Sequence, residues 1–340
     1  MKRFSTSLVF RYRYCILPML KVSTLVSLLA LGVNPFPFAH AASYPTKGIR
    51  VVVAFPPGAG TDLSIRIISP KLSEVLGQQV IVDNRVGASG IVGTEIVAKA
   101  APDGYTLLFT TTDLAINSAL FSALPYNALK DFAAVGRAAN IPFFLVVNSD
   151  LPVKNVHDFL TLAKSRTRNL SYASAGSGTP PHIAAELFKQ VTKLELVHIP
   201  YKGSAQALTD VISGQIQLMF VNTASSIQYV RAGRLRVLGI TTAKRVAIAP
   251  DVPTIAEAGV PGYEFIVWQG MVAPSATPRD VVRRLNRELV RILETAEVKE
   301  KLMSQGTESA PSTPEEFAQL IAADTERLGA VVKVAKMHID

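Results

Sequence analysis

The feature that most constrains the fold is a regular alternation of short β-branched runs with segments whose apolar residues recur at helical spacing. A first series has strand-like runs at 49–55, 78–84 and 105–111, with helical segments at 61–77 and 90–101. A second series follows the extended stretch 138–150 and has strand-like runs at 170–176, 194–201, 216–222 and 235–242. Strands and helices in this order predict parallel α/β sheets, and two series predict two α/β lobes.

Composition favours a packed interior, because 49% of the residues are hydrophobic and 18% are charged. The net charge of +9 at first suggests a nucleic-acid partner. Residues 1–41, however, hold five of the 35 Lys and Arg residues and no acidic residue, which leaves +4 for the rest of the chain. We therefore expect no nucleic-acid partner.

The first 41 residues have the three parts of a secretory signal peptide. Basic residues come first, the apolar run Val22–Val33 follows, and the triplet Ala39-His40-Ala41 supplies a cleavage site. The apolar run is shorter than the roughly 20 residues that span a bilayer. We expect cleavage after Ala41 and a soluble periplasmic chain, with translation starting at the first residue or at Met19.

Two glycine-rich turns join a strand to a helix, one in each series. The first, FPPGAGTD, spans 55–62, and the second, YASAGSGTPPH, spans 172–182. Such turns lie at the carboxyl ends of parallel strands, where open α/β sheets bind ligands, and helix starts attract anions. The turns are predicted to face each other and hold a small dianion without lysine or arginine. The spacing alone is equally compatible with two tight connections.

Little in the sequence favours catalysis. The mature chain has no cysteine, since Cys15 lies in the leader, and no two of its histidines have metal-ligand spacing. No lysine follows the first turn as in a Walker motif, and no G-x-S-x-G motif surrounds Ser174 or Ser177. We expect no enzyme activity, no metal and no cofactor. An exported hydrolase that uses a serine of the second turn is the alternative.

Some residues have both a structural and a functional interpretation. Asp62 either orients the first turn or accepts a hydrogen bond from a ligand, and His182 is expected to hydrogen-bond and not to transfer protons. Lys202 is either a solvated turn residue or steers an anion. Trp268, the sole tryptophan, is a core residue or, from its place before the last helices, a hinge or cleft wall.

The C-terminal part predicts helices at 277–298 and 313–332. Thr277 and Thr313 each precede a proline, as N-cap residues do. Glu316 completes a pattern close to a capping box with Thr313.

Nearly the whole chain beyond the leader resembles one family, the Bug or TctC-like periplasmic solute receptors of tripartite tricarboxylate transporters. The segments that carry the resemblance include YPTKGIRVVVAFPPGAGTD, GQQVIVDNRVGASG, APDGYTLLFTTT, LSYASAGSGTPPH, VHIPYKGSAQALTDVISGQI, PDVPTIAEAGVPGYE and WQGMVAP. The resemblance implies a type II periplasmic-binding-protein fold, in which two crossing strands join two α/β lobes around a ligand cleft. The expected domains are a signal peptide at 1–41, lobe 1 at 42–143 and 267–340, and lobe 2 at 144–266.

The resemblance also implies a function and a site. A small carboxylate or related metabolite is held between the lobes by backbone N–H groups and delivered to integral-membrane transporter subunits by a monomeric receptor. The positions that match the family's ligand-binding segments, or line the same edge, are Phe55, Pro57, Gly58, Ala59, Gly60, Thr61, Asp62, Thr111, Thr112, Ser174, Ala175, Gly176, Gly178, Thr179, His182, Lys202, Gly203 and Asn222.

Three departures from the family pattern leave the ligand open. Ala59 stands where relatives commonly have glycine, so its methyl group narrows the cleft or its backbone must adopt a negative φ. Val86 replaces a usual proline, and Asn222 stands where an aspartate is common. A ligand-sensing subunit of a membrane signalling protein is a further alternative to a transport receptor.

Overall fold

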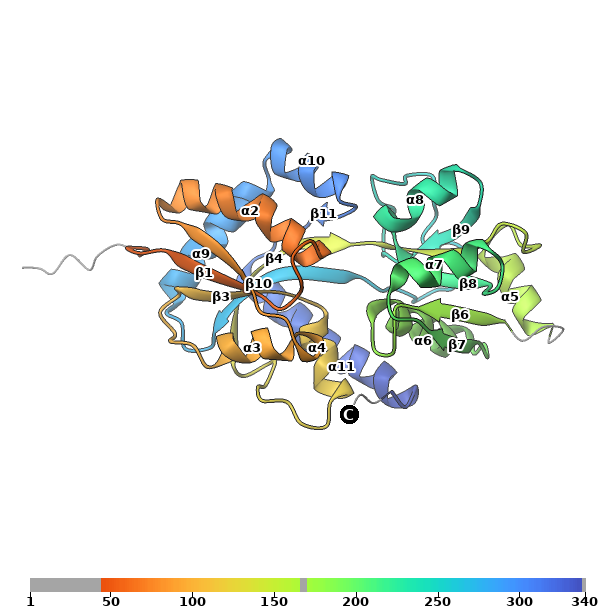
Figure 1. Ribbon diagram of the computed structural model, residues 1–340, viewed down its shortest axis with the longest axis horizontal. Coiled ribbons are helices and arrows are strands. Elements are labelled where there is room, and N and C mark those ends of the chain that lie inside the picture. Colours follow the sequence, from red (N-terminus) through yellow and green to blue (C-terminus); the bar gives the residue numbers. More distant parts are fainter. Residues whose placement is uncertain (1–43, 166–169, 338–340) are drawn as a thin grey trace, which may run out of the picture. The chain divides into compact units, whose positions relative to one another are not determined.

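Two β-sheets, each covered by helices on both faces, make up the part of the chain that the computed structural model describes, residues 44–165 and 170–337 (Figure 1). The predicted signal peptide and its cleavage site lie outside these residues. Within them, no helix is both long and apolar enough to cross a membrane.

Sheet A has six strands in the order β11-β4-β10-β3-β1-β2. Its strands are β1 (Ile49–Val53), β2 (Val80–Asn84), β3 (Thr106–Thr111), β4 (Phe132–Ile141), β10 (Val267–Pro274) and β11 (Glu308–Ser309). Alternate side chains of β1 point to opposite faces, as the pleat requires: Val51 and Val53 join one apolar cluster and Val52 joins another.

Six helices and a short 3₁₀ turn cover sheet A. One face is covered by α2 (Gly60–Leu76), α9 (Arg279–Leu293) and α10 (Ala296–Ser304). The other is covered by η1 (Ala88–Gly90), α3 (Ile91–Ala98), α4 (Asp113–Leu120) and α11 (Pro314–Val334).

Sheet B has five strands in the order β7-β6-β8-β5-β9. They are β5 (Phe143–Asn148), β6 (Ser171–Ser174), β7 (Val197–Pro200), β8 (Leu218–Asn222) and β9 (Leu235–Ile240). One face packs against α5 (Val156–Lys164) and α6 (Pro180–Thr192), and the other against α7 (Ser204–Ile212) and α8 (Thr223–Arg231). All the strand-like runs of both predicted series are thus strands.

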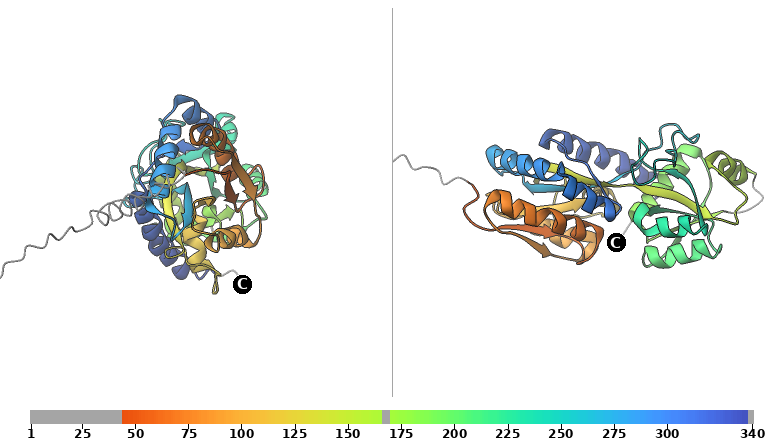
Figure 2. Two further views of the ribbon diagram at one scale, coloured as in Figure 1. Left: turned by 90° about the vertical axis from the view of Figure 1, so that its left-hand side faces the viewer. Right: turned by 90° about the horizontal axis from the view of Figure 1, so that it is seen from above.

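The chain crosses between the sheets twice. Only Pro142 separates the end of β4 from the start of β5, and Figure 2 shows this yellow segment passing directly from one sheet to the other. The return follows β9, through residues 241–266, to β10. Two hydrogen bonds tie the crossings together: Thr241 donates its N–H to Phe143 O at 2.9 Å, and Phe143 donates its N–H to Thr241 Oγ1 at 3.2 Å. The residue numbers at which the sequence divides the lobes stay a prediction.

The strands of each predicted series run in one direction, as expected, but strands outside the two series make both sheets mixed. In sheet A, β10 is antiparallel to β3 and β4, and in sheet B, β5 is antiparallel to β8 and β9. The cause is the crossing itself: β5 enters sheet B from the edge at which β6 and β8 end, so it must run in the opposite direction.

One other expectation needs correction, and the alternatives for Trp268 are resolved. Thr277 does not cap α9: Pro278 holds the N-cap position (φ −55°, ψ 137°), and α9 and α10 are separate helices. Trp268 belongs to the core, because its ring is fully buried against Phe317, and its Nε1 donates to Asp324 Oδ2 at 2.9 Å. The predicted cap at Thr313 is confirmed, as is its capping box with Glu316.

Candidate functional site

The strand registers place each glycine-rich turn at the edge of its sheet where the chain crosses from β4 to β5. We call residues 54–59, between β1 and α2, loop 1, and residues 175–179, between β6 and α6, loop 2. In sheet A, β1, β3 and β4 run in the same direction, so loop 1 lies at the edge where β4 leaves for sheet B.

The same argument holds on sheet B. Phe143, the first residue of β5, pairs with Asn222, the last residue of β8, and β6 runs parallel to β8. Loop 2 therefore lies at the edge where β5 enters. Figure 1 shows the carboxyl ends of β1 and β6 directed toward each other's sheet. This is the topological position at which open α/β sheets bind ligands.

Loop 1 ends in a helix start that no side chain caps. Ala59 occupies the N-cap position of α2, and no side chain accepts a hydrogen bond there. The N–H groups of the first turn are thus available to an anion. Ala59 has φ −67°, which is an ordinary value for an L-residue. The negative φ expected for alanine at this position is therefore adopted without backbone strain.

Asp62 fixes the shape of loop 1. Its carboxylate, 1% exposed, accepts hydrogen bonds from Gly58 N–H at 2.8 Å and from Arg66 Nε and Asn84 Nδ2 at 2.9 Å. Burial opposes ionisation, but these donors outweigh it and hold the pKa of Asp62 below its usual range. All these partners are protein groups, so the structural interpretation of Asp62 is the one with contacts to support it.

Loop 2 is held from inside by two side chains. Gly178 N–H donates to His182 Nδ1 at 3.0 Å, and Gly176 N–H donates to Ser174 Oγ at 3.1 Å. Thr179, the N-cap of α6, makes no side-chain cap, and the next two residues are prolines without N–H groups. Within residues 44–165 and 170–337, the N–H groups of Ala175 and Ser177 have no acceptor.

The two loops share one device. In each, a glycine with positive φ donates its N–H to the side chain four residues later: Gly58 (φ 83°) to Asp62, and Gly178 (φ 76°) to His182. The spacing G-x-x-x-D and G-x-x-x-H is visible in the sequence. The acceptor is an anion in loop 1 and an imidazole in loop 2.

Sequence reasoning missed His198, which lies behind loop 2 on β7. Its Nε2 shares a 2.6 Å hydrogen bond with Ser174 Oγ, and its ring stacks on those of His182 (3.8 Å between centroids) and Tyr172 (4.9 Å). Burial lowers the pKa of His182 to about 3, with His198 and Lys189 contributing, and burial also lowers the pKa of His198. Both rings are therefore neutral at neutral pH.

Other predicted residues lie at the same edges, but the polar side chains of three of them hydrogen-bond to protein groups. Thr111 ends β3 and donates to Asp113, and Thr112 Oγ1 accepts from Trp268 N–H at 3.0 Å. Asn222 caps α8 by accepting from Ser225 N–H at 2.8 Å, whereas Lys202 is exposed just before Gly203 and α7. Ligand contact at the eighteen predicted positions stays a prediction.

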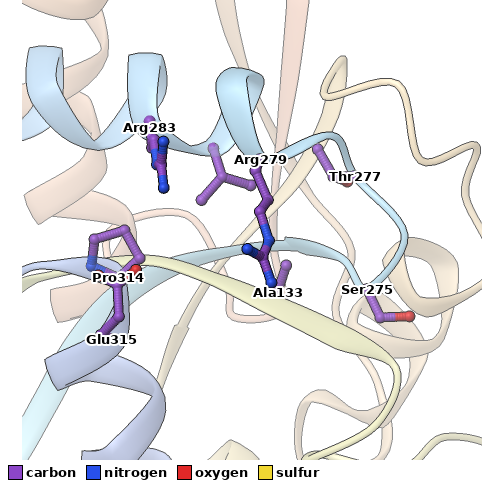
Figure 3. A pocket seen from close by; sticks show the side chains of 8 residues that line it. Ala133, Ser275, Thr277, Arg279, Arg283, Pro314 and Glu315 are labelled. Atoms are coloured by element: carbon purple, nitrogen blue, oxygen red, sulfur yellow. The ribbon is translucent and has the colours of Figure 1, made fainter.

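Among the pockets of the described residues, one borders loop 2 and another lies at the start of α9. A pocket of about 480 Å³ behind loop 2 is lined by Ser177, His182, Glu186, Lys189, His198 and Val334–Met337. A second, of about 300 Å³, lies at the start of α9, where the side chain of Arg279 extends across it toward Ala133 (Figure 3). Because β10 runs antiparallel to β3, the second pocket is at the edge of sheet A opposite loop 1. No group of three or more potential metal ligands occurs in residues 44–165 and 170–337.

Comparison with known proteins identifies the family. Residues 64–337 match the TctC family, described as the tripartite tricarboxylate transporter family receptor. This chain is a TctC-family receptor. It is similar to the protein BugT of Bordetella pertussis, with 34% identity over 295 residues that cover 86% of this chain and 90% of BugT. The family consists of periplasmic solute-binding receptors and not of enzymes, so the hydrolase interpretation of Ser174, whose side chain is 0% exposed, has no support.

Solved structures of relatives confirm the predicted fold. Rpa4515 of R. palustris, solved with adipate, is 37% identical, has a TM-score of 0.73, and is matched over 86% of this chain and 98% of its own. MatC (Rpa3494) of Rhodopseudomonas palustris, solved with bound malate, is 31% identical, has a TM-score of 0.69, and is matched over 85% of this chain and 100% of its own.

Proposed function

We propose that this TctC-family receptor captures a small dicarboxylate between loop 1 and loop 2 and delivers it to integral-membrane subunits of a tripartite transporter. The supporting observation is the pair of loops at facing sheet edges, each leading into a helix start that no side chain caps. The bound ligands of Rpa4515 and MatC, adipate and malate, are both dicarboxylates and support the same class.

One carboxylate would bind at each loop. At loop 1, the acceptor-free N–H groups of the first turn of α2 are reinforced by the positive end of the helix dipole. At loop 2, the N–H groups of Ala175 and Ser177 are the free donors. The nearest ionised side chain, Asp62, is neutralised by Arg66, so it does not oppose a ligand anion strongly.

Transport follows from closure. A ligand shifts an open–closed equilibrium only by binding the closed state more tightly, and a dicarboxylate that touches both loops does so. The closed receptor then presents surfaces of both lobes together to the membrane subunits. The predicted leader would export the chain to the periplasm. A ligand-sensing subunit of a membrane signalling protein would use the same closure.

A binding screen tests the proposal. The receptor is unfolded, dialysed to remove co-purified ligand, refolded, and screened by thermal shift against malate, adipate, the matching monoacids and the matching diamides. A ligand at about 100 times its Kd adds about 2.7 kcal/mol to the free energy of unfolding. We expect diacids to stabilise the protein most. Equal stabilisation by diamides, or none by any diacid, would contradict the proposal.

A further inference from the structure

The imidazole that holds loop 2 works as an acceptor, and this fixes its tautomer. Because Gly178 N–H donates to His182 Nδ1, the neutral ring carries its proton on Nε2. That nitrogen makes no hydrogen bond within residues 44–165 and 170–337, and the ring lines the pocket behind loop 2. His182 therefore holds loop 2 through the backbone N–H of Gly178.

His198 supports the same loop by a second route. Its hydrogen bond reaches Ser174 Oγ, which in turn accepts from Gly176 N–H. Since the two rings lie 3.8 Å apart and nearly parallel, a proton on one opposes a proton on the other.

We propose that His182 is a positioning residue for loop 2, and that its ring must be uncharged for loop 2 to hold a ligand carboxylate. This rests on the proposed function, in that it assigns one ligand carboxylate to loop 2. A proton on His182 Nδ1 removes the acceptor for Gly178 N–H and turns that N–H away from its present direction. The loop then loses the conformation that leaves Ala175 and Ser177 N–H free.

The charged and titratable groups around the pair favour its neutral form. Lys189 on α6 and Lys336 at the end of α11 line the same pocket and disfavour an imidazolium. Glu186 favours one, but its Oε1 already accepts from Lys189 Nζ at 2.6 Å and from the hydroxyl of Tyr172 at 2.5 Å. Burial of the pair adds to the effect of the lysines.

Matched variants separate positioning from direct ligand contact. His182→Asn places an oxygen at the position of Nδ1, so it keeps the acceptor for Gly178 N–H but cannot titrate. His182→Leu keeps the bulk and removes the acceptor. His157→Asn, at an exposed position of α5, is the control.

The first measurement needs no ligand. Amide exchange by NMR gives the protection factor of Gly178 N–H at several pH values in each protein. We expect similar protection in wild type, His182→Asn and the control at neutral pH, and about fivefold to tenfold less in His182→Leu. On acidification wild type should lose this protection as the His182 ring titrates, whereas His182→Asn should retain it. Full protection of Gly178 in a folded His182→Leu variant would overturn the proposal.

The second measurement uses adipate as the probe. Between neutral and acidic pH, the affinity of wild type should fall more steeply than that of His182→Asn. If His182 instead contacts the ligand as a cation, wild type gains affinity in acid relative to His182→Asn, which overturns positioning. If adipate binds neither protein, the exchange data still test whether His182 positions loop 2. The missing binding then contradicts only the proposed ligand class.

Discussion

Asp62 and His182 hold the two loops by the same contact with different chemistry. Each accepts the N–H of a glycine four residues earlier, but Asp62 does so as an anion balanced by Arg66, and His182 does so as a neutral ring. A buried carboxylate that loses its partners destabilises the fold, because its charge is then uncompensated. A neutral ring carries no such charge. We interpret loop 1 as the more rigid end of the site and loop 2 as the end that is sensitive to protonation.

Replacing Asp62 by asparagine tests its role in loop 1. Asp62→Asn keeps an acceptor for Gly58 N–H but loses the ion pair with Arg66, and its amide N–H₂ group faces other donors. We expect the free energy of unfolding in urea to fall by about 1–3 kcal/mol. The control is Asp103→Asn, which breaks the exposed 3.5 Å pair with Lys47 and should change stability by less than about 0.5 kcal/mol. Equal effects of the two variants would exclude a clamp at Asp62.

At the scale of elements, α6 connects the histidine pair to the stability of the fold. Its buried face carries His182, Glu186 and Phe188, and Phe188 packs in the core of sheet B. Protonation of the histidine pair would therefore affect α6, a helix that contributes to the core of sheet B.

Acid should destabilise the protein through His182. The unfolded ring binds a proton near its ordinary pKa of about 6.5, whereas the folded ring, with its pKa lowered to about 3, does not. The free energy of unfolding thus falls as the pH drops below about 6.5, by up to about 1.4 kcal/mol per pH unit for one group. We expect His182→Asn to show a shallower fall between about pH 6 and pH 4. His157→Asn should follow wild type, and parallel curves for all three would refute the assignment.

The elements show what sequence patterns contain and what they omit. The β-branched runs predicted the strands, and helix-start chemistry predicted the capping box at Thr313, because both depend on neighbours along the chain. Strand direction depends on where a distant strand enters the sheet, so the antiparallel β5 and β10 were not predictable. His198 sits in a strand-like run and shows its role only when β6 lies beside β7.

At the scale of the molecule, α11 packs against both sheets. Phe317, near its start, contacts Trp268 of sheet A, and Leu328 and Val331, near its end, join the core of sheet B. Gln190 of α6 donates to Val331 O at 3.2 Å. Any closure of the loops on a ligand must therefore keep or rearrange these contacts, and α11 links such a movement to the helix that carries His182.

The placement of the two loops was more predictable than the contacts within them. The two loops were identified from glycine-rich turns after strands, since that position is fixed by topology. The N–H groups that remain free could not be predicted. Ser174 and His182 accept hydrogen bonds from two of the loop's N–H groups, and these contacts depend on side-chain rotamers and on His198 of the neighbouring strand.

Calorimetric titration of one matched pair, Gly60→Asp and Gly60→Asn, with the best diacid from the screen tests the central claim most directly. A Cβ at Gly60 meets no atom within 4 Å, and the φ of Gly60 is not in the left-handed region, so both variants should fold. Asparagine and aspartate differ little in shape, so the pair isolates charge at the start of α2. We predict that Gly60→Asp binds at least about tenfold more weakly than Gly60→Asn, because its carboxylate occupies the place of the ligand's anion. Equal affinities of the two folded variants would contradict the assignment of a carboxylate to loop 1.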